Sequence, residues 1–146
     1  MRHFTREWWE SGSPEAESVF ARYAKHFASI RASLPPQLVE LEEQHTLHDA
    51  EVKHVACDFV GGLVAIHLNG WDQALQNKVR YDLEFAEVQL FEQVFPQQEY
   101  VEEELGDLGY WECEILPTGV QVNMLFVSGA EFRIVFKGFK LQALAQ

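Results

Sequence analysis

The sequence contains few of the residues that form disulfides, cross membranes or bind polyanions. Only two of its 146 residues are cysteines, Cys57 and Cys113, too few for the disulfide framework of a small secreted domain. It has no run of about 18 apolar residues, so we expect no segment that spans a membrane. Charges interrupt the first ten residues, which argues against a signal peptide. Together these absences predict a cytoplasmic protein with two reduced cysteines and no membrane partner.

Basic residues are scarce as well. Lys and Arg total 11 against 23 Asp and Glu, a formal net charge of −12. Twelve carboxylates and no Lys, Arg or His lie between Arg80 and Arg133. Because such a surface repels the phosphate backbone, we expect the protein not to bind nucleic acid.

The residues that are present fit one folded domain. The length is usual for a single domain, and a content of 47% hydrophobic and 23% charged residues is an ordinary globular composition. No internal repeat or low-complexity tract is visible. We therefore expect a single domain over residues 1–146, with a helical part at 1–46 and a sheet part at 47–146.

The helical part carries two clear helix patterns. Ser13, as N-cap, and Pro14 predict the start of the first helix. Apolar residues then recur at the three- and four-residue spacing of one helix face: Val19, Tyr23, Phe27, Ile30 and Leu34. A shorter helix is expected over 36–44, with Leu38 and Leu41 facing inward. Its glutamates are expected to face outward: Glu40, Glu42 and Glu43. Residues 5–11 are expected to form one further helical turn.

After residue 48 the apolar period changes to two, which predicts strands. The strand segments are 50–57, 63–68, 79–85, 111–115, 120–126 and 132–136. Short turns join the last three, so these must pair antiparallel. Each strand keeps one polar face, whose carboxylates we expect in solvent, as in a sheet covered on one side only. We therefore predict an α+β fold in which N-terminal helices pack on one face of an antiparallel sheet of about six strands.

Potential metal ligands cluster where the helical part gives way to the sheet part. His45, His48 and Asp49 are followed by His54 and Cys57, and imidazole, thiolate and carboxylate are the usual ligands of transition metals. No His-Glu-x-x-His or paired Cys-x-x-Cys signature is present, so we expect no metal and no other cofactor. A small metal-binding protein or hydrolase that uses His45, His48 and Asp49 stays open as an alternative.

An acidic segment with neighbouring aromatics is the candidate protein-binding surface. Its residues are Glu99, Tyr100, Glu102, Glu103, Glu104, Asp107, Tyr110 and Trp111. Its carboxylates would steer a basic partner protein, and exposed aromatics would anchor that partner; the simpler interpretation is a solvated acidic loop. No catalytic motif is present. We therefore expect a non-enzymatic protein that binds another protein, with a small-molecule-binding module between helices and sheet as a further alternative.

One short motif lies near the start of each part of the chain: Phe-Thr-Arg-Glu-Trp at 4–8 in the helical part and Leu-His-Asp-Ala at 47–50 in the sheet part. They resemble an uncharacterised bacterial family, a domain of unknown function that begins with a Phe-Thr-Lys-Glu-Trp-like segment. The strand-rich close of the chain, 130–136 and 139–141, is similar to that family's ending, whereas Arg6 departs from its Lys. The resemblance implies no activity, cofactor or site residue. Some small acidic bacterial α+β domains of similar outline are immunity proteins that neutralise toxins, so the expected protein binder includes an immunity-type inhibitor.

Overall fold

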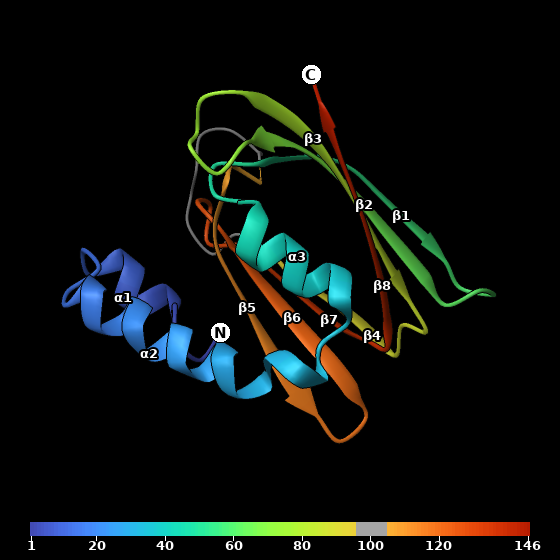
Figure 1. Ribbon diagram of the computed structural model, residues 1–146, viewed down its shortest axis with the longest axis horizontal. Coiled ribbons are helices and arrows are strands. Elements are labelled where there is room, and N and C mark those ends of the chain that lie inside the picture. The colour runs from blue at the N-terminus through green and yellow to red at the C-terminus, as the bar shows by residue number, and fades with distance from the viewer. Residues whose placement is uncertain (96–104) are drawn as a thin grey trace.

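The computed structural model describes residues 1–95 and 105–146, and its helices lie together at the N-terminal end of the chain (Figure 1). They are α1 (Arg6–Glu10), α2 (Ala16–Ile30), the 3-10 helix η1 (Arg31–Ser33) and α3 (Pro36–Gln44). The three expected helical segments are therefore present. None of the described helices is long and apolar enough to span a membrane.

The start of α2 differs from the expectation. Ser13 and Glu15 both have a φ of 52°, so the chain passes through the left-handed region before the helix. The helix begins only at Ala16, without a side-chain cap, and the predicted N-cap at Ser13 is wrong. The apolar stripe is largely right, because α2 buries three of its members: Val19, Tyr23 and Phe27.

The described residues contain eight strands in two antiparallel sheets of four. The first sheet has the order β1-β2-β3-β8: β1 (Glu51–Asp58), β2 (Leu63–Trp71), β3 (Lys78–Ala86) and β8 (Gly138–Ala145). The second has the order β4-β7-β6-β5: β4 (Leu90–Val94), β7 (Glu131–Phe136), β6 (Gly119–Phe126) and β5 (Leu108–Leu116). The α+β class with antiparallel pairing is confirmed, but the single sheet of about six strands is wrong.

Two of the eight strands, β4 and β8, are absent from the six predicted, and the reasons are local. β4 has only five residues, and β8 follows β7 after the single residue Lys137, so the two strands read as one run. The division into two sheets was not predicted for a more general reason. Alternation marks a covered face, but a helix and another sheet cover that face equally well.

The two sheets pack face to face and enclose the core. Tyr81, Leu83 and Phe85 of β3 point inward and are at most 1% exposed. The ring of Phe85 lies 4.8 Å from that of Phe136 in β7, measured between centroids, and this contact joins the two sheets. The inward residues of β3 and β7 therefore form the core, as the period of two predicts.

The helices lie along two sheet edges rather than over one face, which corrects the expected packing. Figure 1 shows α3 between β8 and β5, and α2 beside β5. The amide of Cys113 in β5 donates to the Tyr23 hydroxyl at 3.0 Å, and His26 Nε2 donates to the Cys113 carbonyl oxygen, also at 3.0 Å. On α3, the Gln37 side-chain oxygen accepts the Leu141 amide of β8 at 2.7 Å. Both helices thus supply partners for backbone groups that an exposed edge strand leaves unpaired.

Candidate functional site

A cavity of about 380 Å³ lies where α2, α3, the 46–48 segment and β5 meet, and we call it the aromatic pocket. Five aromatic side chains line it: Phe4, Phe20, Tyr23, Tyr110 and Trp111. Its polar lining includes the side chains of Glu42, Thr46 and His48. Apolar walls with a few polar groups, enclosing a volume of this order, are typical of sites for small organic ligands.

Phe4 connects the aromatic walls of the pocket. Its ring stacks on Tyr110 with the centroids 5.1 Å apart, and it lies 5.1 Å from Tyr23 and 5.5 Å from Phe20. Trp8 of α1 contacts Tyr110 at 5.3 Å. Ring pairs at these distances attract one another, so the walls form one packed unit.

A buried carboxylate on β5 holds the N-terminal segment that carries Phe4. Glu112 is only 3% exposed, and it accepts the backbone amides of three consecutive residues: Arg2, His3 and Phe4. The last two of these bonds are 3.0 and 3.2 Å long. Such charge-assisted bonds offset the cost of burying the carboxylate. The expectation that Glu112 faces solvent is therefore wrong, because residues 2–4 cover it.

The junction between α3 and β1 is bound to β5 at the rim of the pocket. The Asp49 amide donates to the Leu108 carbonyl oxygen at 2.9 Å, and His48 Nδ1 lies 2.9 Å from the Gly109 carbonyl oxygen. Because a carbonyl oxygen only accepts, Nδ1 carries the proton of this imidazole. A Cβ at Gly109 would collide with the ring of Trp9, so this close packing requires glycine.

Glu42 places an unpaired carboxylate oxygen at the pocket. Its Oε2 is buried and has no hydrogen-bond partner among the described residues. Burial, and to a smaller extent the charge of Glu43, raises the pKa of Glu42 to about 7. Burial likewise raises the pKa of Tyr23 and that of Cys113, which lie near Glu42 on α2 and β5. A buried carboxylate with a perturbed pKa in a cavity is a candidate functional group.

The expectation that Glu42 faces outward is wrong. Leu38, Leu41 and Glu42 stand at positions i, i+3 and i+4 and therefore share one face of α3. Both leucines are at most 1% exposed. This spacing is the sequence signal that could have placed Glu42 on the buried face. Glutamate is ordinarily assigned to the solvent face, however, because burying a carboxylate is costly. Glu43, one position further, is exposed as expected, and Glu40 is half-buried.

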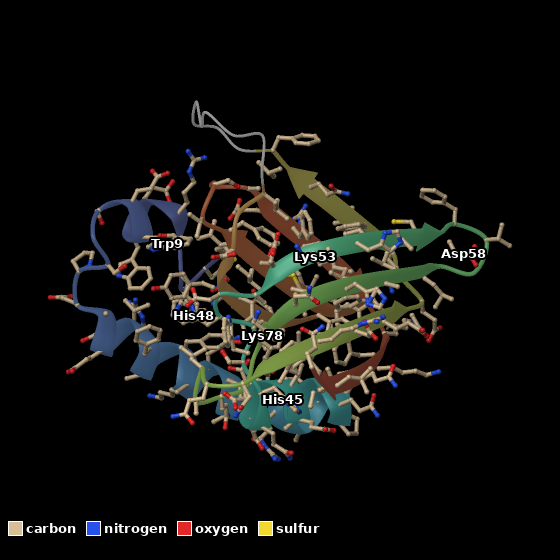
Figure 2. All side chains as sticks on the ribbon, turned by 90° about the horizontal axis from the view of Figure 1, so that it is seen from above. Trp9, His45, His48, Lys53, Asp58 and Lys78 are labelled. Carbon is tan, nitrogen blue, oxygen red and sulfur yellow. The ribbon has the colours of Figure 1, made fainter. Side chains whose placement is uncertain are left out.

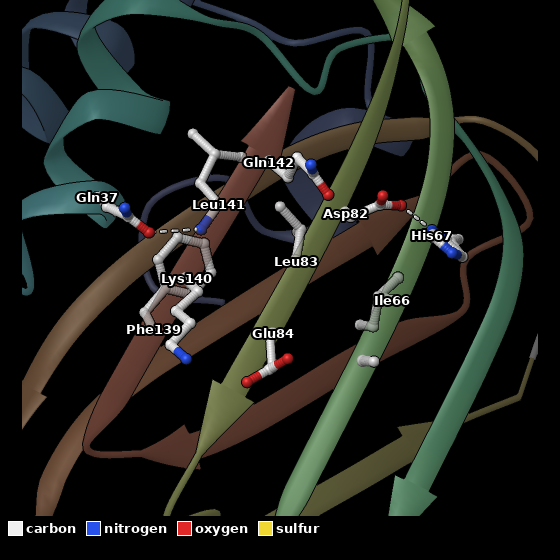
Figure 3. Close-up of a pocket in the computed structure, with 11 residues that line it drawn as sticks. Gln37, Ile66, His67, Asp82, Leu83, Glu84, Phe139, Lys140, Leu141 and Gln142 are labelled. Atoms are coloured by element: carbon white, nitrogen blue, oxygen red, sulfur yellow. Dashed lines mark hydrogen bonds and ion pairs between the residues drawn. The ribbon is translucent and has the colours of Figure 1, made fainter. Parts of the chain in front are cut away.

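A larger concavity, of about 670 Å³, lies on β2, β3 and β8 (Figure 3). Several of its polar side chains have partners within the protein. His67 contacts Asp82, whose carboxylate also binds Arg80 at 3.2 Å, and Gln37 accepts the Leu141 amide. Glu84, Lys140 and Gln142 line it as well. Among the described residues, however, none of its polar side-chain atoms is both buried and unpaired, whereas Glu42 Oε2 is. We therefore place the candidate site at the aromatic pocket.

The candidate metal ligands do not converge on one point. His45 Nε2 lies 3.8 Å from Glu40, whereas His48 Nε2 lies 3.5 Å from Asp49. Figure 2 shows His45 beside α3 and His48 nearer to Trp9. The two remaining candidates lie farther along the chain, on β1: His54 and Cys57. Among residues 1–95 and 105–146, no group of three His, Cys, Asp or Glu side chains is arranged to hold a metal ion.

Most of the candidate protein-binding surface, the acidic segment with its neighbouring aromatics, lies outside the described residues: Glu99, Tyr100, Glu102, Glu103 and Glu104. Of the other members, Asp107 is exposed, whereas Tyr110 and Trp111 are half-buried. These two aromatics line the aromatic pocket. Protein binding through the acidic surface therefore stays a prediction.

No protein-family model matches the chain, and no curated protein or solved structure matches it. The resemblance to an uncharacterised bacterial family therefore stays a proposal. The function has to be inferred from the chemistry of the pocket.

Proposed function

We propose that the protein binds a small organic molecule in the aromatic pocket. The observation that carries the proposal is Glu42, a residue of the pocket lining whose buried Oε2 has no hydrogen-bond partner among the described residues. An unpaired buried carboxylate is costly to the folded protein. A ligand that donates a hydrogen bond or brings a positive charge to Glu42 offsets that cost and is thereby oriented in the pocket.

The rest of the lining supports the same function. Burial of apolar ligand surface against the rings contributes about 25 cal/mol per Å². Phe4 and Tyr110 are held by neighbouring rings and by the Glu112 bonds before any ligand arrives. Walls that are already ordered lose little conformational entropy on binding, which favours affinity.

The test is a screen of small aromatic compounds by thermal unfolding, because a ligand that binds only the folded state raises the Tm. The pocket-filling variant Thr46→Phe should abolish the Tm increase caused by each hit. The same substitution at Thr118, which is exposed in the turn between β5 and β6, is the matched control and should preserve it. A screen without hits, or hits that still stabilise Thr46→Phe, would refute the proposal.

Binding of a basic protein, in the manner of an immunity-type inhibitor, is the second candidate function. The observation that favours it is the tip of the β1–β2 hairpin, where Phe59 and Val60 are 94% and 101% exposed. Figure 2 shows this tip, marked by Asp58, projecting away from the sheets. Exposed apolar side chains anchor partner proteins, and a net charge of −12 steers a basic partner towards the surface.

Two variants test the anchoring and the steering separately in a pull-down. Reversal of Glu102, Glu103 and Glu104 to Lys should abolish recovery of a basic partner at low ionic strength, with the Tm nearly unchanged. Replacement of Phe59 and Val60 by Ser should weaken recovery at every ionic strength, because apolar contact is not screened by salt. A partner that both variants recover as well as the wild type would refute this candidate.

A further inference from the structure

The groups around Glu42 leave the aromatic pocket without a positive charge. The titratable groups near its carboxylate are Tyr23 on α2, Cys113 on β5 and Glu43 on α3, and none of them is cationic. The Arg31 guanidinium is bound to Glu43 and not to Glu42. No Lys or Arg occurs among the described residues that line the pocket.

His48, at the rim, does not supply the missing cation. Its Nδ1–H donates to the Gly109 carbonyl oxygen, and its Nε2 lies 3.5 Å from Asp49 Oδ1. The Asp49 carboxylate therefore lies beside the second ring nitrogen, so the His48–Asp49 pair adds no net positive charge to the rim. The imidazole is also about half exposed, so solvent screens whatever charge it carries. The described lining thus brings no fixed positive charge to the pocket, and its one carboxylate is that of Glu42.

The walls of the pocket are complementary to positive charge as well. The face of an aromatic ring has a negative electrostatic potential, and ammonium groups bind over it, most strongly where water is excluded. Tyr23 and Tyr110 each pack on Phe4, with the ring centroids 5.1 Å apart in both pairs. A desolvated carboxylate beside such rings forms a site with two independent attractions for a cation.

We infer that the ligand of the aromatic pocket is an organic cation, a protonated amine or quaternary ammonium group carried on an apolar body. This inference rests on the proposed function and adds the charge of the ligand to it. The cationic group lies against Glu42, and the apolar body packs on the rings.

The protonation of Glu42 predicts how the affinity for the ligand changes with pH. Burial raises the pKa of Glu42 to about 7, so its carboxyl changes protonation state near neutral pH. A cation binds the ionised form, so its affinity rises as the pH rises through about 7 and then levels off. A neutral ligand that accepts a hydrogen bond from protonated Glu42 has the opposite dependence and binds more weakly at high pH.

The experiment compares three indoles of similar size by ligand-observed NMR titration. They are tryptamine, a cation, its neutral counterpart tryptophol, and indole-3-propionate, an anion. Above the pKa of Glu42, tryptamine should bind about ten-fold more tightly than tryptophol, equivalent to about 1.4 kcal/mol, and the anion should bind most weakly. Glu42→Gln should reduce the preference for tryptamine to the smaller part that the aromatic rings supply, and it should remove the pH dependence. Glu43→Gln removes the neighbouring exposed carboxylate and should preserve the preference.

The outcomes separate this inference from the proposed function. If tryptophol binds as tightly as tryptamine, or if Glu42→Gln leaves the preference for tryptamine undiminished, the inference is overturned and small-molecule binding stands. If none of the three indoles binds at millimolar concentration while other compounds of the thermal screen do, the inference is overturned and small-molecule binding stands. If neither the indoles nor any compound of the screen binds, both are refuted. Glu42→Gln keeps the shape of the side chain and removes a buried charge, so this variant should fold.

Discussion

Substitution of Glu112 by alanine removes the acceptor that holds residues 2–4 against β5. The carboxylate is 3% exposed and accepts three backbone amides. A hydrogen bond to a charged group contributes about 1.5–3 kcal/mol, so simple addition gives at most about 9 kcal/mol. The freed segment would regain hydration by moving into water. We therefore expect Glu112→Ala to lower the free energy of unfolding by about 3–5 kcal/mol, as in other broken buried charge networks.

A loss of that size is a large fraction of the stability of a single domain, and urea unfolding measures it directly. Glu112→Gln keeps one acceptor oxygen without the charge and should cost less, about 1–3 kcal/mol. The matched control is Glu114→Ala, two residues further along β5. The Glu114 carboxylate contacts the exposed guanidinium of Arg2, and an exposed ion pair contributes under about 1 kcal/mol.

A second measurement follows the aromatic pocket. Phe4 belongs to the segment that Glu112 holds and stacks on Tyr110, so Glu112→Ala should also change the near-UV circular dichroism and weaken ligand binding. If Glu112→Ala and Glu114→Ala unfold at the same urea concentration, residues 2–4 do not depend on this carboxylate and the reasoning is refuted.

Four further predictions concern separate parts of the molecule. Between about pH 4.5 and 7 the folded protein keeps a proton on Glu42 that the unfolded chain has lost, so stability should fall by about 3 kcal/mol as the pH rises through that range. Glu42→Gln should remove this fall in stability. Equal profiles of unfolding free energy against pH for the wild type and Glu42→Gln would contradict the prediction. Phe27→Ala should lower the free energy of unfolding by about 3–5 kcal/mol through the cavity it leaves, and an unchanged urea midpoint would show that Phe27 is not in the core. A thiol reagent should modify exposed Cys57 quickly and buried Cys113, whose pKa is raised by burial, only on unfolding; two fast thiols in the folded protein would contradict this. Elemental analysis should find no stoichiometric transition metal, and about one zinc per chain, lost in His48→Ala, would overturn that prediction.

Local patterns in the sequence determine the helices and most of the strands. A proline at the first helical position and the spacing of Leu38 and Leu41 predict α3 with the bounds the structure has, Pro36–Gln44. The alternation over 79–85 predicts β3 and the burial of Tyr81, Leu83 and Phe85. These features depend on residues within a few positions of one another, so a single sequence contains all the information they need.

The candidate site depends instead on residues that are distant in the chain. Glu112 has the position of a solvated strand residue, and the amides that bury it come from residues 108 to 110 positions away. Glu42 has the position of a helix residue beside the apolar stripe, and its carboxylate is buried only once α2 and β5 lie next to α3. No local pattern records such contacts.

The sequence by itself thus determined the helical segments, the strand period, the antiparallel meander of β5, β6 and β7 and the inward faces of β3, β6 and β7. The tertiary structure decided that two sheets cover one another, that α2 and α3 lie along the edges of β5 and β8, and that Glu42 enters a pocket of aromatic rings. The physical reason is that a hydrophobic period shows which face is buried, whereas the identity of the covering element depends on packing across the whole chain.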